Sequence, residues 1–238
     1  MKFYRRLPKI QAITFDLDDT LYSNRPVMVN AERAMISYFA DKLAAKNDHN
    51  LTFDRTFWWP FRSQAMQASP QISHDVTVLR VQTYRLGILS LGYSEQQAEQ
   101  YAEQALNFFL EQRSTFTIPQ SSFELLDYLA SKYPLVAISN GNVDTDKVGL
   151  TPYFKHFLHA SVEHQRKPSR QMFDKAASLL SLPSQHILHV GDCGKADILG
   201  AHRAQMPCAW LSSYDVGKPV FVLPHVELTD ITQLSSLF

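Results

Sequence analysis

Residues 10–21, Ile10-Gln11-Ala12-Ile13-Thr14-Phe15-Asp16-Leu17-Asp18-Asp19-Thr20-Leu21, decide the fold because a short apolar run stops there at carboxylates. A largely apolar run of this length predicts a buried strand. In open parallel sheets, ligands bind outside the carboxyl ends of the strands. Asp16 and Asp18 are therefore the first candidates for chemistry, whereas we expect Asp19 to face elsewhere and to bond to turn amides.

Four further apolar runs, all in the second half of the chain, also predict buried strands: 135–138, 157–160, 187–190 and 208–211. Helix-length segments lie before or between these runs at 121–132, 168–182 and 196–205. This alternation is typical of a parallel sheet covered by helices. The second half of the chain is therefore predicted to be α/β.

Residues 22–115 have a different pattern, with no convincing strand. Long amphipathic stretches occur there at 29–45, 75–91 and 94–112. We therefore predict a discontinuous core formed by residues 1–21 and 116–238. A helical cap domain, residues 22–115, is predicted to be inserted directly after the first strand.

Composition limits the class of protein. The chain has 238 residues, 45% of them hydrophobic, which suits one large domain or a core with an inserted subdomain. Twenty-three basic residues balance twenty-three acidic ones, so the overall charge favours neither nucleic acid nor a membrane as a partner.

The two cysteines, Cys193 and Cys208, fit neither a disulfide framework nor a zinc site. Because the N-terminal apolar stretch is too short for a secretory leader or a membrane span, we expect a cytoplasmic protein. The sequence leaves open whether it is a monomer or a homodimer.

The two carboxylates at the end of the first predicted strand suit phosphoryl transfer. Asp16 can attack phosphorus as a nucleophile and form an acyl phosphate, which divides one difficult displacement into two easier ones. Asp18 can protonate the leaving alkoxide as a general acid and then deprotonate the attacking water as a general base.

Polar residues that follow the later apolar runs complete such a site. Asp192 is predicted to bind magnesium with Asp16 and Asp18, because crowded carboxylates need a cation and hard oxygen ligands favour magnesium. The residues predicted to bind the phosphate are Thr20, Ser139, Asn140 and Lys167. Asp197 is a secondary candidate with two open roles, since it can ligate the metal through water or can support Lys167 or the start of a helix.

This ordered set of motifs resembles the haloacid dehalogenase-like (HAD) hydrolase superfamily across the whole chain. Asp16-x-Asp18-x-Thr20 is similar to its first motif, Ser139 to its second, Lys167 to its third, and Gly191-Asp192 through Asp197 to its fourth. The insertion is placed like a type 1 cap. The resemblance implies a Rossmann-like core, magnesium and an aspartyl-phosphate intermediate. Cys193 departs from the pattern, because another acid often stands there, and this affects the outer shell of the metal.

Softer features resemble the bacterial phosphatases that act on flavin mononucleotide and on the phosphorylated ribitylaminouracil of riboflavin synthesis. They are Phe3-Tyr4-Arg5, the first-motif run through Tyr22, Asn24-Arg25-Pro26, Ser139-Asn140-Gly141-Asn142 and His189-Val190-Gly191-Asp192. This resemblance implies a small phosphorylated metabolite as the substrate. The alternatives are a phosphatase for sugar phosphates, phosphoglycolate or nucleotides, a haloacid dehalogenase, and a non-catalytic protein that binds a phosphorylated ligand.

Trp58-Trp59-Pro60-Phe61 in the predicted cap has two interpretations. These rings can stack on a flat substrate, or they can form the core of a small helical domain, which is the interpretation we favour. The histidines, His189 among them, show no metal-ligand spacing and are predicted to be structural or on the surface.

Overall fold

The computed structural model describes residues 1–47, 51–214, 217–218 and 222–238, and it divides into two compact units. The first, which we call the core unit, comprises Met1–Asn24, Thr117–Gly141 and Thr145–Phe238. The second, which we call the helical unit, comprises Arg25–Phe116 and Asn142–Asp144. That the helical unit acts as a cap remains a prediction.

In the part of the chain that the structure describes, the core unit contains one sheet with the strand order β1-β7-β6-β5-β2-β3-β4. The strands are β1 (Lys2–Phe3), β2 (Ala12–Phe15), β3 (Leu135–Ser139), β4 (His156–His159), β5 (Ile187–Gly191), β6 (Cys208–Leu211) and β7 (Val226–Leu228). Strand β1 pairs antiparallel with β7, and every other pair is parallel. The predicted α/β fold with a mostly parallel, Rossmann-like sheet is confirmed.

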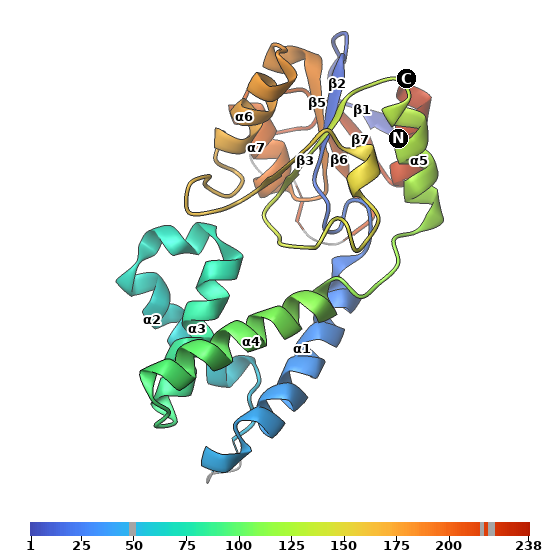
Figure 1. Ribbon diagram of the computed structural model, residues 1–238. Helices are drawn as coiled ribbons and strands as arrows, with labels where there is room; N and C mark the ends of the chain where they lie inside the picture. The colour runs from blue at the N-terminus through green and yellow to red at the C-terminus, as the bar shows by residue number, and fades with distance from the viewer. Residues whose placement is uncertain (48–50, 215–216, 219–221) are drawn as a thin grey trace. The chain divides into compact units, whose positions relative to one another are not determined.

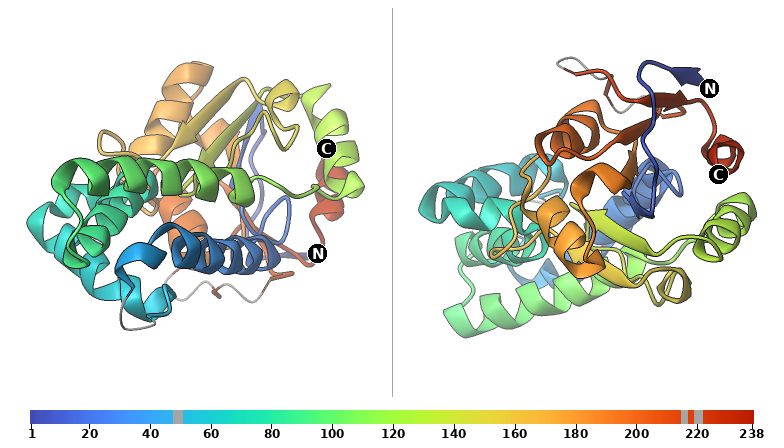
Figure 2. Two further views of the ribbon diagram at one scale, coloured as in Figure 1. Left: turned by 60° about the horizontal axis from the view of Figure 1, so that its bottom comes forward. Right: turned by 90° about the horizontal axis from the view of Figure 1, so that it is seen from above.

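Helices cover both faces of this sheet (Figure 1). Helices α6 (Gln171–Leu180) and α7 (Gly200–Arg203) lie on one side, and α5 (Gln120–Ala130) lies on the other. Figure 2 shows the same layers from two further directions. Because both faces are covered, β2, β3 and β5 are buried along their whole length, which explains why each reads as a largely apolar run.

Some elements of the core unit differ from the sequence-based expectation. Strands β1 and β7 were not predicted, because with two and three residues neither is long enough to show a strand pattern. The helix predicted at 196–205 starts earlier, as a π-helical segment, Gly194–Leu199, which continues into α7. The 3-10 segments of the core unit are Thr151–Tyr153, Ser184–His186 and Ile231–Leu237.

The helical unit is built from four α-helices and two 3-10 segments in its described residues. They are α1 (Asn24–Lys42), Ala44–Lys46, α2 (Arg55–Ala68), Pro70–His74, α3 (Val76–Ser90) and α4 (Glu95–Arg113). Asp54, Asp75 and Ser94 cap the starts of α2, α3 and α4 by accepting bonds from backbone N–H groups of the first turn. Helix α2 was not predicted, and it contains Pro60, a residue that usually ends or kinks a helix.

The aromatic segment of α2 contributes to the core of the helical unit. The ring of Trp58 lies 4.5 Å from that of Phe39 and 5.0 Å from that of Tyr84, centroid to centroid. The packing interpretation is thus confirmed for Trp58. Trp59 is different, because it is 54% exposed and lies beneath the guanidinium of Arg55.

None of the described helices is long and apolar enough to span a bilayer.

Candidate active site

The carboxyl ends of three adjacent strands carry the predicted site. Asp16 follows β2, Ser139 ends β3, and Asp192 follows β5. Strand β2 lies between the other two, and the Asp16 N–H donates to Val190 O of β5 at 2.9 Å. Residues far apart in the sequence therefore meet at one edge of the sheet, as expected for a parallel α/β fold.

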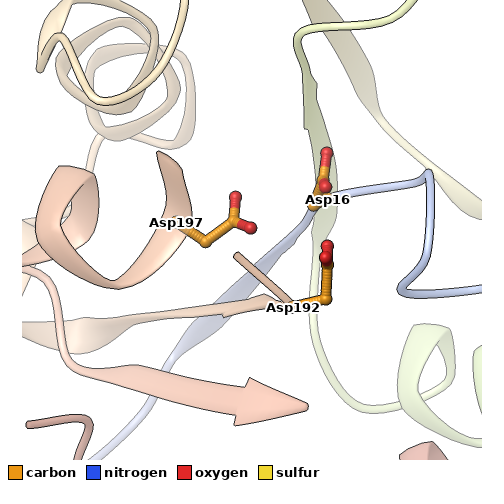
Figure 3. Close-up of side chains that lie close together, drawn as sticks. All are labelled: Asp16, Asp192 and Asp197. Carbon is orange, nitrogen blue, oxygen red and sulfur yellow. The ribbon is translucent and has the colours of Figure 1, made fainter. Parts of the chain in front are cut away.

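An acidic group forms at this edge from Asp16, Asp192 and Asp197. One carboxylate oxygen from each of the three lies within 4.8 Å of those from the other two. All three side chains are buried, and Figure 3 shows them arriving from different segments around one small space. Three buried carboxylates so close together repel one another, and oxygen ligands of this kind suit a hard divalent cation.

A buried ammonium group offsets part of this negative charge. Lys167 is 2% exposed, and its Nζ lies 2.7 Å from Asp16 Oδ1 and 2.7 Å from Asp197 Oδ1. Its third bond is donated to the carbonyl of Ile138, also at 2.7 Å. All three protons of the ammonium are therefore used, which is the condition under which a lysine tolerates burial.

The four charged groups shift one another's pKa values. Burial raises the pKa of Asp16 well above its usual range, and the carboxylates of Asp197 and Asp192 raise it further against the opposing effect of Lys167. Burial and then the charge of Asp197 raise the pKa of Asp192 to about 7. Burial acts in the same direction on Asp197, but Lys167 and His189 outweigh it and hold the pKa of Asp197 below its usual range.

The pKa of Lys167 itself is raised. Burial would lower it, but the carboxylates of Asp16 and Asp197 outweigh that effect. Lys167 and Asp197 thus favour their ionised forms, whereas burial and the neighbouring carboxylates disfavour the ionised forms of Asp16 and Asp192 in the absence of a cation.

Asp18 is turned toward a different part of the site. Its Oδ1 accepts a hydrogen bond from the Tyr22 hydroxyl at 2.7 Å, and it is not a member of the group of three carboxylates. A Cβ atom on Gly141 would lie 2.4 Å from Asp18 Oδ2, closer than two such atoms can approach. Glycine at 141 therefore lets the Asp18 carboxylate lie against the loop that follows Ser139. The Asp18 side chain therefore lies next to the loop of Ser139 and Asn140, which are predicted to bind phosphate. That Asp18 ligates a metal remains a prediction.

The side chains predicted to bind phosphate also make bonds within the protein. Ser139 Oγ accepts from the Gly141 N–H at 2.9 Å, and the Thr20 hydroxyl donates to Asp192 Oδ1 at 3.2 Å. The amide of Asn140 clamps the backbone of Lys167, since it accepts from the Lys167 N–H at 2.8 Å and donates to the Lys167 carbonyl at 3.1 Å. Asn140 thus positions Lys167, and its own contact with phosphate stays a prediction.

Asp197 makes the contacts of a supporting residue. Its Oδ1 accepts from Lys167 and lies 3.2 Å from His189 Nε2, and its Oδ2 accepts from the Cys193 N–H at 2.9 Å. A Cβ atom on Gly191 would lie 2.3 Å from Asp197 Cγ, so glycine is required where the carboxylate crosses the end of β5. Of the two open roles of Asp197, this geometry favours support of Lys167.

His189 and Thr14 also support the site, although neither was predicted from the sequence to belong to it. They are cross-strand neighbours on β5 and β2, both fully buried, and His189 Nδ1 lies 2.9 Å from the Thr14 hydroxyl. Because the Asp197 carboxylate only accepts, His189 Nε2 carries the proton and Nδ1 accepts from Thr14. A signal was present, since each is a polar residue within an otherwise apolar strand. His189 is structural, as expected, and what it supports is the candidate active site.

Comparisons of the sequence and of the structure with known proteins point to the same family. A model of the haloacid dehalogenase-like hydrolases matches residues 10–205. The chain is 37% identical to the Escherichia coli (strain K12) 5-amino-6-(5-phospho-D-ribitylamino)uracil phosphatase YigB over the full length of both chains. It resembles the crystal structure of a 2-haloacid dehalogenase from Pseudomonas syringae pv. Tomato DC3000 with a TM-score of 0.89 and 29% identity, covering 96% and 97% of the two chains. It shares its fold with the HAD-hydrolase YfnB from Bacillus subtilis, with a TM-score of 0.67, 17% identity and coverage of 97% and 99%.

Proposed function

The chain belongs to the haloacid dehalogenase-like hydrolase family and is a phosphatase, and we propose that it cleaves phosphomonoesters through an aspartyl phosphate formed on Asp16. The observation that carries this proposal is the buried contact of Lys167 Nζ with Asp16 Oδ1, beside the carboxylate of Asp192. The ammonium holds one oxygen of Asp16 in a fixed position. Its positive charge can also stabilise the negative charge on the phosphoryl oxygens in the transition state.

We propose magnesium as the cofactor, held by Asp16 and Asp192 with the predicted participation of Asp18. The donor set fits, because it consists of buried carboxylate oxygens whose pKa values are raised by burial and by one another. When bound, the metal neutralises charge on the phosphate oxygens and keeps the carboxylates ionised. The steps of the reaction are then carried out by the side chains of the chain itself.

In the first step, a carboxylate oxygen of Asp16 forms a bond to phosphorus as the bond from phosphorus to the ester oxygen breaks. Asp18 gives its proton to the departing alkoxide. In the second step, Asp18 takes a proton from water as the water oxygen bonds to phosphorus, and the bond from phosphorus to Asp16 breaks. This assignment is supported by the position of Asp18, two residues beyond Asp16 and beside the loop of Gly141.

For the substrate, we propose a phosphate ester of a ribityl side chain, either ribitylaminouracil phosphate or flavin mononucleotide. The support is the 37% identity to YigB, whose name gives the first of these compounds. The test is a phosphate-release panel with magnesium that covers both compounds, sugar phosphates, phosphoglycolate and nucleotides. Fast turnover of another class, with neither ribityl ester hydrolysed, would reject this substrate and leave the phosphatase mechanism untouched.

Dehalogenation is the second candidate, because the structure from Pseudomonas syringae is named a 2-haloacid dehalogenase. In that reaction a carboxylate attacks carbon and halide leaves without a proton. The reaction has no evident use for Asp18, whose carboxylate is held between Tyr22 and Gly141. Chloride release from 2-chloropropionate distinguishes the two, and we expect none.

A further inference from the structure

The end of the core sheet opposite the candidate active site is basic. The segments that lead into β2, β5, β6 and β7 are residues 4–11, 181–186, 204–207 and 222–225, and none of these described segments contains an acid. Basic side chains in these segments and in the last turn of α7 are Arg5, Arg6, Lys9, His186, His202, Arg203 and His225. Because the whole chain is neutral, this is an uneven distribution of charge, with carboxylates at one end of the sheet and cations at the other.

A pocket opens within this basic end. Its volume is about 620 Å³, which lies within the range of small-molecule sites. The side chains that line it include His202 and Arg203 from α7, Gln185 from the segment before β5, His225 from the segment before β7, and the buried Met206. Hydrogen-bond donors thus surround a partly apolar space, and no acid lines it among the described residues.

The surroundings of His225 are basic. The pKa of His225 is lowered first by burial and then by the charges of Arg5 and His202. The backbone of Arg5 is fixed beside it, because the Arg5 N–H donates to the His225 carbonyl at 3.2 Å. Burial is the larger cause, and the smaller effect of Arg5 and His202 has the direction expected where an anion would be stabilised.

The hydrogen bonds of His225 and Arg203 leave donors for such an anion. His225 Nδ1 accepts from the Cys208 N–H at 3.2 Å, so Nε2 is the ring nitrogen that carries a proton. Arg203 makes one long bond, from Nη1 to the carbonyl of Pro168 at 3.4 Å, and a guanidinium has five donors in all. Favourable interaction with the end of α7 would explain His202 and Arg203 alone, but it would not explain Arg5 or His225.

We propose that this pocket is a second ligand site, which binds a small organic anion with at least two negative charges through Arg203, His202 and His225. A phosphate ester and a dicarboxylate share this chemistry. The site lies at the amino ends of the strands, away from Asp16 and Asp192, so its occupant is not the substrate of the phosphatase. The inference does not depend on the proposed catalytic mechanism.

The test is a titration of the full chain, with magnesium present and at constant ionic strength, followed through the ring NMR signals of His202 and His225. Inorganic phosphate serves as the probe in one arm and succinate in the other. We expect saturable shifts of both rings in at least one arm, and the arm that saturates at lower concentration identifies the preferred anion. Since a charge-assisted bond contributes about 1.5–3 kcal/mol, Arg203→Gln should weaken binding roughly tenfold or more.

A matched control is Arg170→Gln, which removes an exposed arginine of the same unit that is paired with Asp174 outside the pocket. It should leave the titration unchanged, and His202→Gln should weaken it. Shifts that rise without saturating in both arms, or that are the same in Arg203→Gln, would overturn the proposal. Salt-sensitive binding of a single-stranded oligonucleotide, with no saturation by either small anion, would assign the surface to nucleic acid instead and would also overturn it.

Discussion

Lys167 Nζ lies 2.7 Å from Asp16 Oδ1, and the ammonium side chain is 1% exposed. Lys167→Met would remove this charge and leave the carboxylates of Asp16 and Asp197 without it. Breaking a buried pair in this way costs about 3–5 kcal/mol. We expect a loss of this size in the free energy of unfolding, measured with urea, and a loss of phosphatase activity. Lys175→Met, an exposed lysine on α6, is the control and should change neither. A stable but inactive Lys167→Met protein would show that Lys167 acts on phosphate without stabilising the carboxylates.

Magnesium binding should strengthen as the pH rises. In the metal-free protein, burial raises the pKa of Asp192 to about 7 and raises the pKa of Asp16 as well, so cation binding must displace the protons bound to these carboxylates. Calorimetric titration in two buffers of different ionisation enthalpy should reveal proton release near about pH 6, decreasing toward about pH 8. Affinity and proton release that are both independent of pH would contradict this.

The same pKa shifts predict whether the stability of the metal-free protein rises or falls with pH. A group whose pKa is raised on folding stabilises the fold below its unfolded pKa, and that contribution is lost as the pH rises toward the folded pKa. For Asp192 the window runs from about 4 to about 7. Urea unfolding in the presence of a chelator should therefore show stability that falls across this window. Saturating magnesium should reverse the trend, because it binds the ionised form.

Gly141→Ala should damage the site through Asp18. The new Cβ would lie 2.4 Å from Asp18 Oδ2, so the carboxylate must move. We expect general acid–base catalysis to fall by about a hundredfold or more in kcat. A double-mutant cycle provides the control, because the stability cost of Gly141→Ala should largely disappear in the Asp18→Ala background. Additive costs would mean that the two residues do not meet.

His189 should act on activity through Asp197 and Lys167. His189→Phe retains a ring against Phe173 but removes the bond to Asp197 Oδ1, and loss of such a supporting bond typically costs about tenfold or more in activity. His189→Gln keeps a donor and should recover most of kcat. Cys208→Ala is the control. It changes a buried residue on β6 that is the direct strand neighbour of His189, and it should leave kcat unaltered. If the Phe and Gln variants are equally active, His189 serves packing alone.

The sequence predicted which strand ends meet in the core sheet, because that prediction rests on local pattern. Asp16, Ser139 and Asp192 each follow an apolar run, and the geometry of parallel strands requires the ends of neighbouring runs to meet. Strands β1 and β7 escaped prediction because two or three residues cannot display a period.

Side-chain direction was the harder part. Spacing predicted Asp18 as a metal ligand, and that stays a prediction, but spacing did not indicate that its carboxylate accepts from Tyr22 and lies against Gly141. The roles of Asn140 and His189 depend on contacts with Lys167 and Asp197, residues that the chain brings near only after folding. A polar residue in an apolar strand marks His189 as unusual, but which distant residue it bonds to cannot be read from a single sequence.

The most direct test of the account is to trap the phosphoryl group on Asp16. Asp18→Asn should still accept a phosphoryl group from p-nitrophenyl phosphate, since that leaving group needs no proton, but it should hydrolyse the intermediate slowly because the base is missing. Mass spectrometry of the acid-quenched, digested protein should then find one added phosphoryl group on the peptide that contains Asp16. Asp16→Asn should give none. Turnover of the substrate by Asp18→Asn with the peptide unmodified, or with the phosphoryl group on another residue, would contradict the account.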